Sequence, residues 1–172
     1  MDSYGDSTVM ASELHVDAIK HSGGTSAMTI DSSGRISRSI IPSFKAYKAS
    51  SGNVTYGASD SISADFDTLD FNIGSHFSTS TGKFTVPIAG LYMFGYDLFN
   101  NTTSTASKRV NLRLSSGEQF GGQGQAAKTS DFVLSVVDEL PVGETVEIIS
   151  SYSDTIIYHG QNHSYFWGYF IG

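Results

Sequence analysis

Alternation of apolar and polar side chains is the dominant pattern in this chain. It is clearest in Arg109–Leu114, where Val110, Leu112 and Leu114 alternate with charged or amide side chains. A period of two is typical of a β-strand with one face in a core and one in water. Comparable segments, separated by clusters of Gly, Ser, Asn and Pro, predict strands at 44–47, 62–69, 84–86, 91–99, 109–114, 132–137, 145–149 and 165–171. This spacing predicts an all-β sandwich or jelly roll.

Two of these segments are apolar on both faces. In 165–171, Phe166, Gly168 and Phe170 occupy one face and a row of aromatic and aliphatic side chains occupies the other, and 132–137 is two-sided as well. A large apolar surface left in water marks an interface. We therefore predict that one sheet is covered by neighbouring subunits, with Phe132, Leu134, Tyr165, Trp167, Tyr169 and Ile171 as the interface residues. The alternative is that the N-terminal segment folds back over that face within one chain.

The first 41 residues differ from the rest. They are polar with short apolar stretches, and such a segment cannot bury a core of its own. The turn signal Asp31–Gly34 predicts a small hairpin between 26–30 and 35–38. Pro42 marks the expected boundary, which gives an extended N-terminal segment, 1–41, and a head domain, 42–172. The apolar residues expected to attach the segment to a partner or to pair between chains are Leu14, Val16, Ile19, Met28, Ile30 and Ile36.

Composition narrows the classes of partner. The net charge of -7 argues against nucleic acid or an anionic membrane as the main partner. The chain has no cysteine, so neither disulfides nor thiol chemistry contribute. The first residues, Met1–Asp6, lack a basic region followed by an apolar one, so we expect no signal peptide.

The segment 82–94 carries a resemblance to a known family. Its pattern, Gly-x-Phe-x-x-Pro-x-Ala-Gly-Leu-Tyr-x-Phe, resembles the central signature of the globular head of complement component 1q. The segments 140–146 and 164–171 resemble a turn and the closing strand of the same family. The resemblance implies a ten-stranded jelly-roll sandwich similar to tumour necrosis factor, assembled as a homotrimer with aromatic residues at its centre. The signature residues expected in the core are Phe84, Gly90, Tyr92, Phe94, Phe166 and Gly168.

A second, shorter resemblance concerns the N-terminal segment. The run 27–36 looks like short turn motifs in tail-fibre and related virion proteins of bacteriophages. Heads of the complement component 1q type also occur on phage virion proteins. Animal members more often carry a collagen stalk, a signal peptide or cysteine, and none is visible here. The two resemblances together favour a virion protein.

No catalytic constellation stands out. His159 and His163 have a metal-ligand spacing, but their segment is expected to be a loop rather than a helix. The run Gly121–Gly124 lacks the lysine of a phosphate-binding loop. The carboxylates Asp60, Asp65, Asp67 and Asp70 are close in sequence, yet they match no defined calcium loop. We expect no enzyme activity and no cofactor, with loop-bound calcium left open by the family resemblance.

These observations predict a non-enzymatic, trimeric structural protein on the surface of a bacteriophage virion, as a fibre, turret or capsid decoration. The N-terminal segment would contact other virion proteins. The head would face outward and bind a host surface glycan or protein through the loops 49–60, 100–107, 115–130 and 151–163. The alternative is a soluble, secreted trimeric ligand or carbohydrate-binding module of the complement component 1q-like family.

Overall fold

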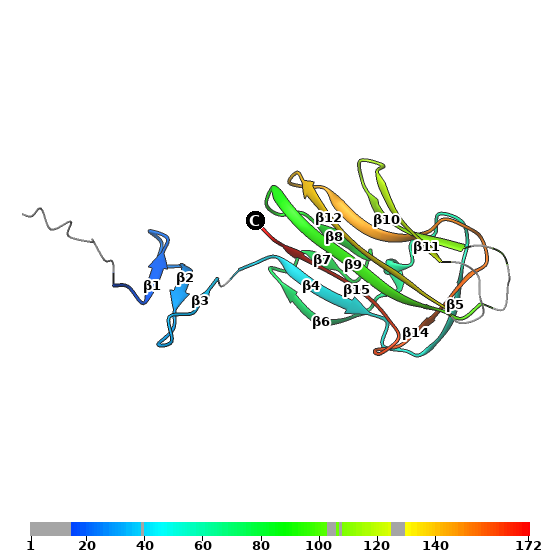
Figure 1. Ribbon diagram of the computed structural model, residues 1–172, viewed down its shortest axis with the longest axis horizontal. Helices are drawn as coiled ribbons and strands as arrows, with labels where there is room; N and C mark the ends of the chain where they lie inside the picture. Colours follow the sequence, from blue (N-terminus) through cyan, green and yellow to red (C-terminus); the bar gives the residue numbers. More distant parts are fainter. Residues whose placement is uncertain (1–14, 39, 103–105, 107, 125–129) are drawn as a thin grey trace, which may run out of the picture. The chain divides into compact units, whose positions relative to one another are not determined.

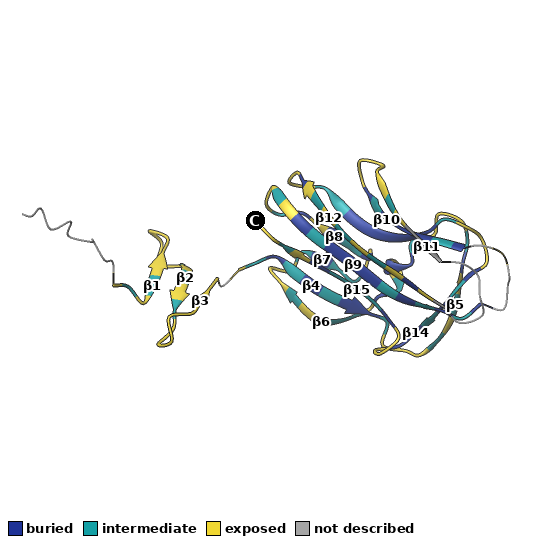
Figure 2. Ribbon diagram, in the orientation of Figure 1, coloured by how far each residue is buried: buried dark blue, intermediate teal, exposed yellow. Residues whose placement is uncertain are grey.

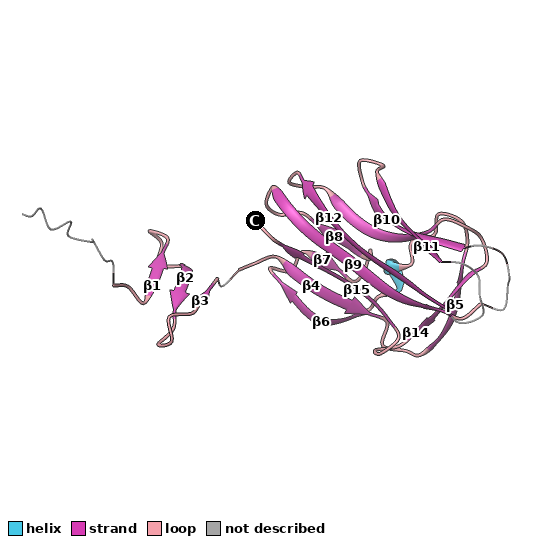
Figure 3. Ribbon diagram, in the orientation of Figure 1, coloured by secondary structure: helices cyan, strands magenta, loops and turns pink. Residues whose placement is uncertain are grey.

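The protein is described by a computed structural model that covers residues 15–172 apart from 39, 103–105, 107 and 125–129 (Figure 1). The described residues form β-strands and one short 3-10 turn, Ser63–Asp65 (Figure 3). No helix among them is long and apolar enough to cross a membrane. The chain forms two compact units, divided between Ile40 and Ile41, whereas the sequence placed the boundary at Pro42.

The first unit is a small antiparallel sheet in the order β1-β2-β3. Its strands are β1 (Ala18–Lys20), β2 (Ser26–Ile30) and β3 (Ile36–Ser37). The turn between β2 and β3 is stabilised by Asp31, whose Oδ1 accepts hydrogen bonds from the backbone N–H groups of Ser33 and Arg35 at 2.8 and 3.0 Å. The predicted hairpin is therefore confirmed. Its described residues are all exposed or half-buried, as Figure 2 shows, so they form no core among themselves.

The second unit is a sandwich of two sheets, one with seven strands and one with five. The seven-stranded sheet consists of β4 (Ser43–Tyr47), β5 (Gly52–Tyr56), β6 (Thr68–Ile73), β9 (Gly90–Asn100), β12 (Ser130–Leu140), β14 (Thr155–His159) and β15 (Ser164–Phe170). Its order is β5-β14-β9-β15-β4-β6, and β12 pairs with the other edge of β9 along its whole length. The five-stranded sheet has the order β11-β10-β13-β8-β7. Its strands are β7 (Phe77–Ser78), β8 (Lys83–Thr85), β10 (Lys108–Leu114), β11 (Gln119–Gly124) and β13 (Thr145–Ser150).

Aromatic rings dominate the core between the two sheets. Phe44 of β4 stacks on Phe84 of β8 with ring centroids 5.1 Å apart, and Phe166 of β15 meets Phe44 edge-on at 4.8 Å. Gly168 lies beneath this cluster, where an added Cβ would come within 2.4 Å of the Phe94 ring. All the signature side chains are buried in this core, whereas Gly90 begins β9 with a φ of 147°. The signature thus fixes the packing between the sheets.

The structure corrects four local predictions. Residues 62–69, predicted as one strand, form the 3-10 turn and only the beginning of β6; Ile62 and Phe66 are buried, but from a loop. The predicted loops 49–60, 115–130 and 151–163 contain the strands β5, β11 and β14, respectively. The sandwich consequently has more strands than the ten expected. Gly and Gln in β11, and Gly and Asn in β5, hide the period-two pattern, and the adjacent Ile156 and Ile157 interrupt it in β14.

Candidate functional site

The candidate functional surface is the outer face of the seven-stranded sheet. By outer face we mean the side chains of this sheet that point away from the five-stranded sheet. Residues opposite one another in the register share a face, so Val137, Met93 and Tyr169 form one row across β12, β9 and β15. Large apolar side chains with more than a third of their surface exposed on this face are Phe71, Ile73, Leu91, Val133, Val137 and Tyr169. So many exposed apolar groups on one sheet are typical of an interface.

Trp167 lies flat against the middle of this face. An added Cβ on Gly95 would come within 2.3 Å of Cζ2 of the indole, so the glycine lets the ring rest directly on β9. Tyr169 stacks on Trp167 with ring centroids 6.0 Å apart and an interplanar angle of 16°. Tyr165 and Trp167 are half-buried, while Tyr169 and Ile171 are exposed. The predicted interface residues of the last strand therefore all lie outside the core.

The prediction took the wrong face of β12. Phe132 is 1% exposed and belongs to the core of its own chain, and Leu134 packs against that core. The residues that point outward are Val133, 62% exposed, and Val137, 49% exposed. Both faces of this strand are apolar in sequence, so the alternation alone did not distinguish inside from outside.

A row of polar side chains crosses this apolar face. We call it the polar belt, and it consists of Asp131, Asp97, Tyr165, Lys45 and Asp70, on β12, β9, β15, β4 and β6 respectively. The hydroxyl of Tyr165 donates to Oδ2 of Asp97 over 3.3 Å, and the Lys45 ammonium lies 4.9 Å from the centre of the Tyr165 ring. Lys45 also pairs with Asp70 at 2.8 Å. Sequence reasoning missed this belt because its residues come from strands whose pairing was unknown.

The polar belt is charge-balanced at one end only. Lys45 neutralises Asp70, but among the described residues no cation pairs with Asp97 or Asp131. Burial raises the pKa of Asp97 above its ordinary range, and the negative charge of Asp131 raises it further, against the opposing effect of the Tyr165 hydrogen bond. The acidic end of the belt therefore holds two carboxylates that repel one another on a partly apolar surface.

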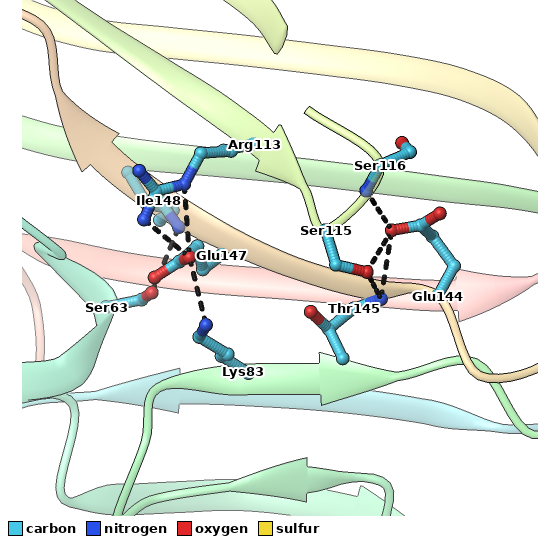
Figure 4. Close-up of polar contacts among 9 residues, drawn as sticks. All are labelled: Ser63, Lys83, Arg113, Ser115, Ser116, Glu144, Thr145, Glu147 and Ile148. Carbon is cyan, nitrogen blue, oxygen red and sulfur yellow. Dashed lines mark hydrogen bonds and ion pairs between the residues drawn. The ribbon is translucent and has the colours of Figure 1, made fainter. Parts of the chain in front are cut away.

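The outer face of the five-stranded sheet has the opposite character. Glu147 of β13 lies between Arg113 of β10 and Lys83 of β8, with ion pairs of 2.8 and 3.2 Å (Figure 4). Burial by itself would raise the pKa of Glu147, but hydrogen bonds from Arg113 and Lys83 lower it. At the end of the same sheet, Glu144 accepts hydrogen bonds from the Ser115 hydroxyl and the Ser116 N–H. The two carboxylates Glu144 and Glu147 are thus both held by partners within one chain.

A buried polar cluster lies at the β5–β14 end of the core. Nε2 of His159 is 2.6 Å from the Tyr56 hydroxyl, which donates to Oδ2 of Asp65 at 2.7 Å. His159 is completely buried, and in the described structure its Nδ1 has no hydrogen-bond partner. Burial lowers the pKa of His159 to about 4. His159 was interpreted as a loop residue, although the alternation of Thr155, Ile157 and His159 could have placed it on the inner face of a strand.

The four acidic residues considered for calcium are held by separate partners. Asp65 accepts a hydrogen bond from the Tyr56 hydroxyl, and its Oδ1 lies 3.6 Å from Nζ of Lys48. Asp70 forms an ion pair with Lys45. Asp67 accepts from the N–H of Ala49, and Asp60 from the N–H of Gly57. Within the described residues there is no group of three or more His, Asp or Glu side chains that could hold a metal ion.

The predicted attachment residues all belong to the first unit. Val16, Met28 and Ile30 are half-buried there, and Ile19 and Ile36 are exposed by 47% and 62%. Leu14 lies outside the described residues, as do 103–105, 107 and 125–129 of the predicted contact loops. The described part of those segments belongs to the second unit and includes the strands β5, β11 and β14.

Comparison with known proteins identifies the second unit. A model of the C1q domain matches residues 46–171. The fold is similar to the globular domain of zebrafish complement 1qA, with 17% identity, coverage of 76% of this chain and 98% of that one, and a TM-score of 0.56. It is also similar to the Eiger TNF of S. frugiperda, with 10% identity over 77% and 94% of the two chains and a TM-score of 0.61. Murine APRIL matches with 8% identity over 76% and 99%, and a TM-score of 0.58.

A sequence comparison with curated proteins gives no significant match. The predicted likeness to complement component 1q and tumour necrosis factor is nevertheless confirmed, because the C1q domain model spans most of the sandwich and the structural matches agree with it. The chain belongs to the C1q domain family.

Proposed function

We propose that this protein is a non-enzymatic homotrimeric display module, in which three heads associate through the outer face of the seven-stranded sheet. The observation that carries the proposal is the contrast between the two sheets. On one outer face Glu147 is paired with Arg113 and Lys83 of its own chain, and the other face exposes Val133, Val137 and Tyr169 beside Trp167. Domains of the C1q and tumour necrosis factor type form homotrimers and are ligand-binding or structural rather than enzymatic, which supports the same reading.

The expected gain from assembly is large. Burying an aromatic or large aliphatic side chain stabilises an assembly by roughly 2–3 kcal/mol. Each head contributes several such side chains, and three heads share the interface. Assembly would also bring three copies of each loop together in a single particle, so that weak individual contacts add up to high avidity.

The oligomeric state tests this proposal directly. Light scattering on the full chain should give three times the 18.4 kDa mass of one chain. Val133→Asp places a charge on a side chain that is 62% exposed in the single head, so the fold should tolerate it while the trimer dissociates. Trp167→Asp should dissociate or precipitate the protein. Arg109→Asp, on the outer face of the other sheet, is the matched control and should remain trimeric.

Two results would contradict the trimer. A clean monomer for the unmodified chain would show that the outer face is not an assembly surface. Equal behaviour of Val133→Asp and Arg109→Asp would show that assembly, if present, uses another part of the chain.

We assign the trimer to the surface of a bacteriophage virion, as a fibre, turret or capsid decoration, with the first unit contacting other virion proteins. Support comes from the run 27–36, whose sequence looks like turn motifs of phage virion proteins and which forms the β2–β3 hairpin, and from Ile19 and Ile36, which are exposed. Mass spectrometry of purified particles should detect the chain in stoichiometric amounts. Its absence from the particles, together with a trimer in solution, would reject the virion role alone.

The second candidate is a secreted trimeric ligand or carbohydrate-binding module. The observation that favours it is an aromatic group next to a pair of amides: the Tyr158 and His163 rings are 4.9 Å apart, and the nearby Asn101 side chain donates to that of Asn53 at 2.9 Å. Aromatic surfaces with a few placed polar groups are typical of small-molecule and sugar sites. Binding to a glycan array that is lost in Tyr158→Ala would favour this candidate over a purely structural role.

A further inference from the structure

The acidic end of the polar belt lies inside the surface that the proposed trimer would cover. Asp97 is directly opposite Val133 on β12 and Tyr165 on β15, two strands whose outward side chains form the proposed interface. Asp131 is two residues from Val133 and therefore points to the same face. A second copy seated on this face would remove water from both carboxylates.

Nothing in the described part of a single head compensates for that loss of water. The hydrogen bond to Asp97 comes from a neutral hydroxyl, that of Tyr165, and is long at 3.3 Å. The nearest cation across the belt, Lys45, is committed to Asp70 at 2.8 Å. An unpaired carboxylate that loses its water is far more stable as the neutral acid.

We propose that trimer assembly is linked to proton uptake at the Asp97–Asp131 pair, so that the trimer tightens as the pH falls and loosens as it rises. This inference rests on the proposed function, since it needs a second copy on the outer face. It adds a regulatory property of that surface: the same residues that face the partner sense the pH of the medium.

The sign follows from the two states. Assembly buries the carboxylates and raises their proton affinity above that of the free head, so the trimer binds more protons than three separate heads. A lower pH must then favour the trimer. In the single head, burial and the charge of Asp131 already raise the pKa of Asp97, and assembly would raise this pKa further.

Several other charged or titratable groups lie on the same face as Asp97. The charged or titratable side chains that face it from the neighbouring strands and the loop after β14 are Asp131, Tyr165, Lys45, Asp70, Tyr158 and His163. Among the side-chain types in this set, only the imidazole of histidine ordinarily changes charge between pH 5 and 8. His163 lies against the Phe99 ring, with centroids 6.0 Å apart, so its contribution has to be separated experimentally.

Sedimentation velocity over a concentration series, at about pH 7.5 and pH 5, measures the linkage on the full chain. Because one unit of linked pKa shift changes a site's equilibrium tenfold, we expect the concentration at half-assembly to be at least about tenfold lower at the acidic pH. Asp97→Asn keeps the shape of the side chain but fixes it as neutral. This variant should assemble at about pH 7.5 as tightly as the unmodified chain does at pH 5, with no further change on acidification.

Three further variants isolate the pair. Asp131→Asn, at an exposed position that the fold tolerates, should weaken the pH dependence. His163→Gln should leave it intact. Glu118→Gln removes the same charge from a turn of the other sheet and should behave like the unmodified chain. Circular dichroism at both pH values confirms that each variant is folded.

The outcomes separate this inference from the trimer itself. A trimer whose dissociation does not change with pH, or an Asp97→Asn variant with the same pH dependence as the unmodified chain, would overturn the proton linkage and leave the trimer intact. Tighter assembly at the higher pH would overturn it too, since it would mean that cations of the neighbouring copy pair with the acids. A protein that is monomeric at both pH values, with or without Asp97→Asn, would overturn both proposals.

Discussion

The stability of the head should fall in mild acid because of one buried imidazole. The Tyr56 hydroxyl hydrogen is committed to Asp65 at 2.7 Å, so its oxygen accepts the hydrogen on Nε2 of His159 at 2.6 Å. A second proton on the ring would have to go to Nδ1, which is buried and without a partner in the described structure, so the neutral imidazole is favoured. Burial accordingly lowers the pKa of this imidazole from 6.5 to about 4.

The sign and size of the effect follow from linkage. The unfolded chain binds this proton near pH 6.5 and the folded chain only near pH 4, so the unfolded state gains protons first as the pH falls. Stability is fully present above the unfolded value and is lost between the two values. At about 1.4 kcal/mol for each unit of pKa shift, the loss amounts to about 3 kcal/mol once both states are protonated, and to about 2 kcal/mol at pH 5.

Urea unfolding at a fixed protein concentration, from about pH 7.5 down to pH 4.5, measures this loss. The informative quantity is the difference in free energy of unfolding between the unmodified chain and His159→Gln at each pH. Other titrating groups, including those that affect assembly, contribute to both proteins and cancel in this difference. His21→Gln, at an exposed position of the first unit, is the control.

We expect the stability advantage of the unmodified chain over His159→Gln to shrink by about 2 kcal/mol between neutral pH and pH 5, while the difference from His21→Gln stays constant. A difference that does not change with pH would refute the reasoning. It would mean that His159 is not buried in the neutral form, or that Nδ1 finds a partner when protonated.

Three further substitutions test the packing and the charges of the head, each by urea unfolding. Phe84→Ala empties the centre of the core and should cost about 3–5 kcal/mol of unfolding free energy. Gly168→Ala should cost about 1–3 kcal/mol, because its Cβ would come within 2.4 Å of the Phe94 ring. Glu147→Gln leaves the Arg113 guanidinium without its 2.8 Å ion pair and should cost about 1–3 kcal/mol, less in high salt.

Each of these predictions has a result that contradicts it. A Phe84→Ala protein of unchanged stability would place the signature outside the core. An unaffected Gly168→Ala protein would mean that β15 and β9 separate at little cost. A salt-independent effect of Glu147→Gln would show that the side chain matters for its shape and not for its charge.

Sequence patterning predicted the core much better than the surface. Alternation identifies a strand and shows which residues share each of its two faces. Where one face is polar, as in Arg109–Leu114, the apolar face must be the buried one. Where both sides are apolar the choice is open, and for β12 the prediction placed Phe132 at the interface although it is 1% exposed. Register decides the matter: Val133 shares a face with Asp97, and that pairing is a long-range property.

The polar features could not be found from sequence for a related reason. Asp131, Asp97, Tyr165, Lys45 and Asp70 are far apart along the chain and meet because five strands lie side by side. The His159–Tyr56 contact likewise joins residues from β14 and β5, which pair only through the long return of the chain. Local sequence propensity carries no information about the polar belt or about the His159–Tyr56 contact.

The same strand serves the fold and the proposed function through alternate residues. Along β9, the signature residues Tyr92 and Phe94 and the neighbouring Tyr96 point inward, while Met93 and Asp97 point outward to the assembly face. The inward residues are held by close packing with the other sheet, so changing them costs stability. The outward residues lie outside the core and contact only neighbours on their own face, such as Tyr165 beside Asp97, so changing them should alter assembly and its pH dependence while leaving the fold intact. This separation is the reason that Val133→Asp and Asp97→Asn can report on assembly alone.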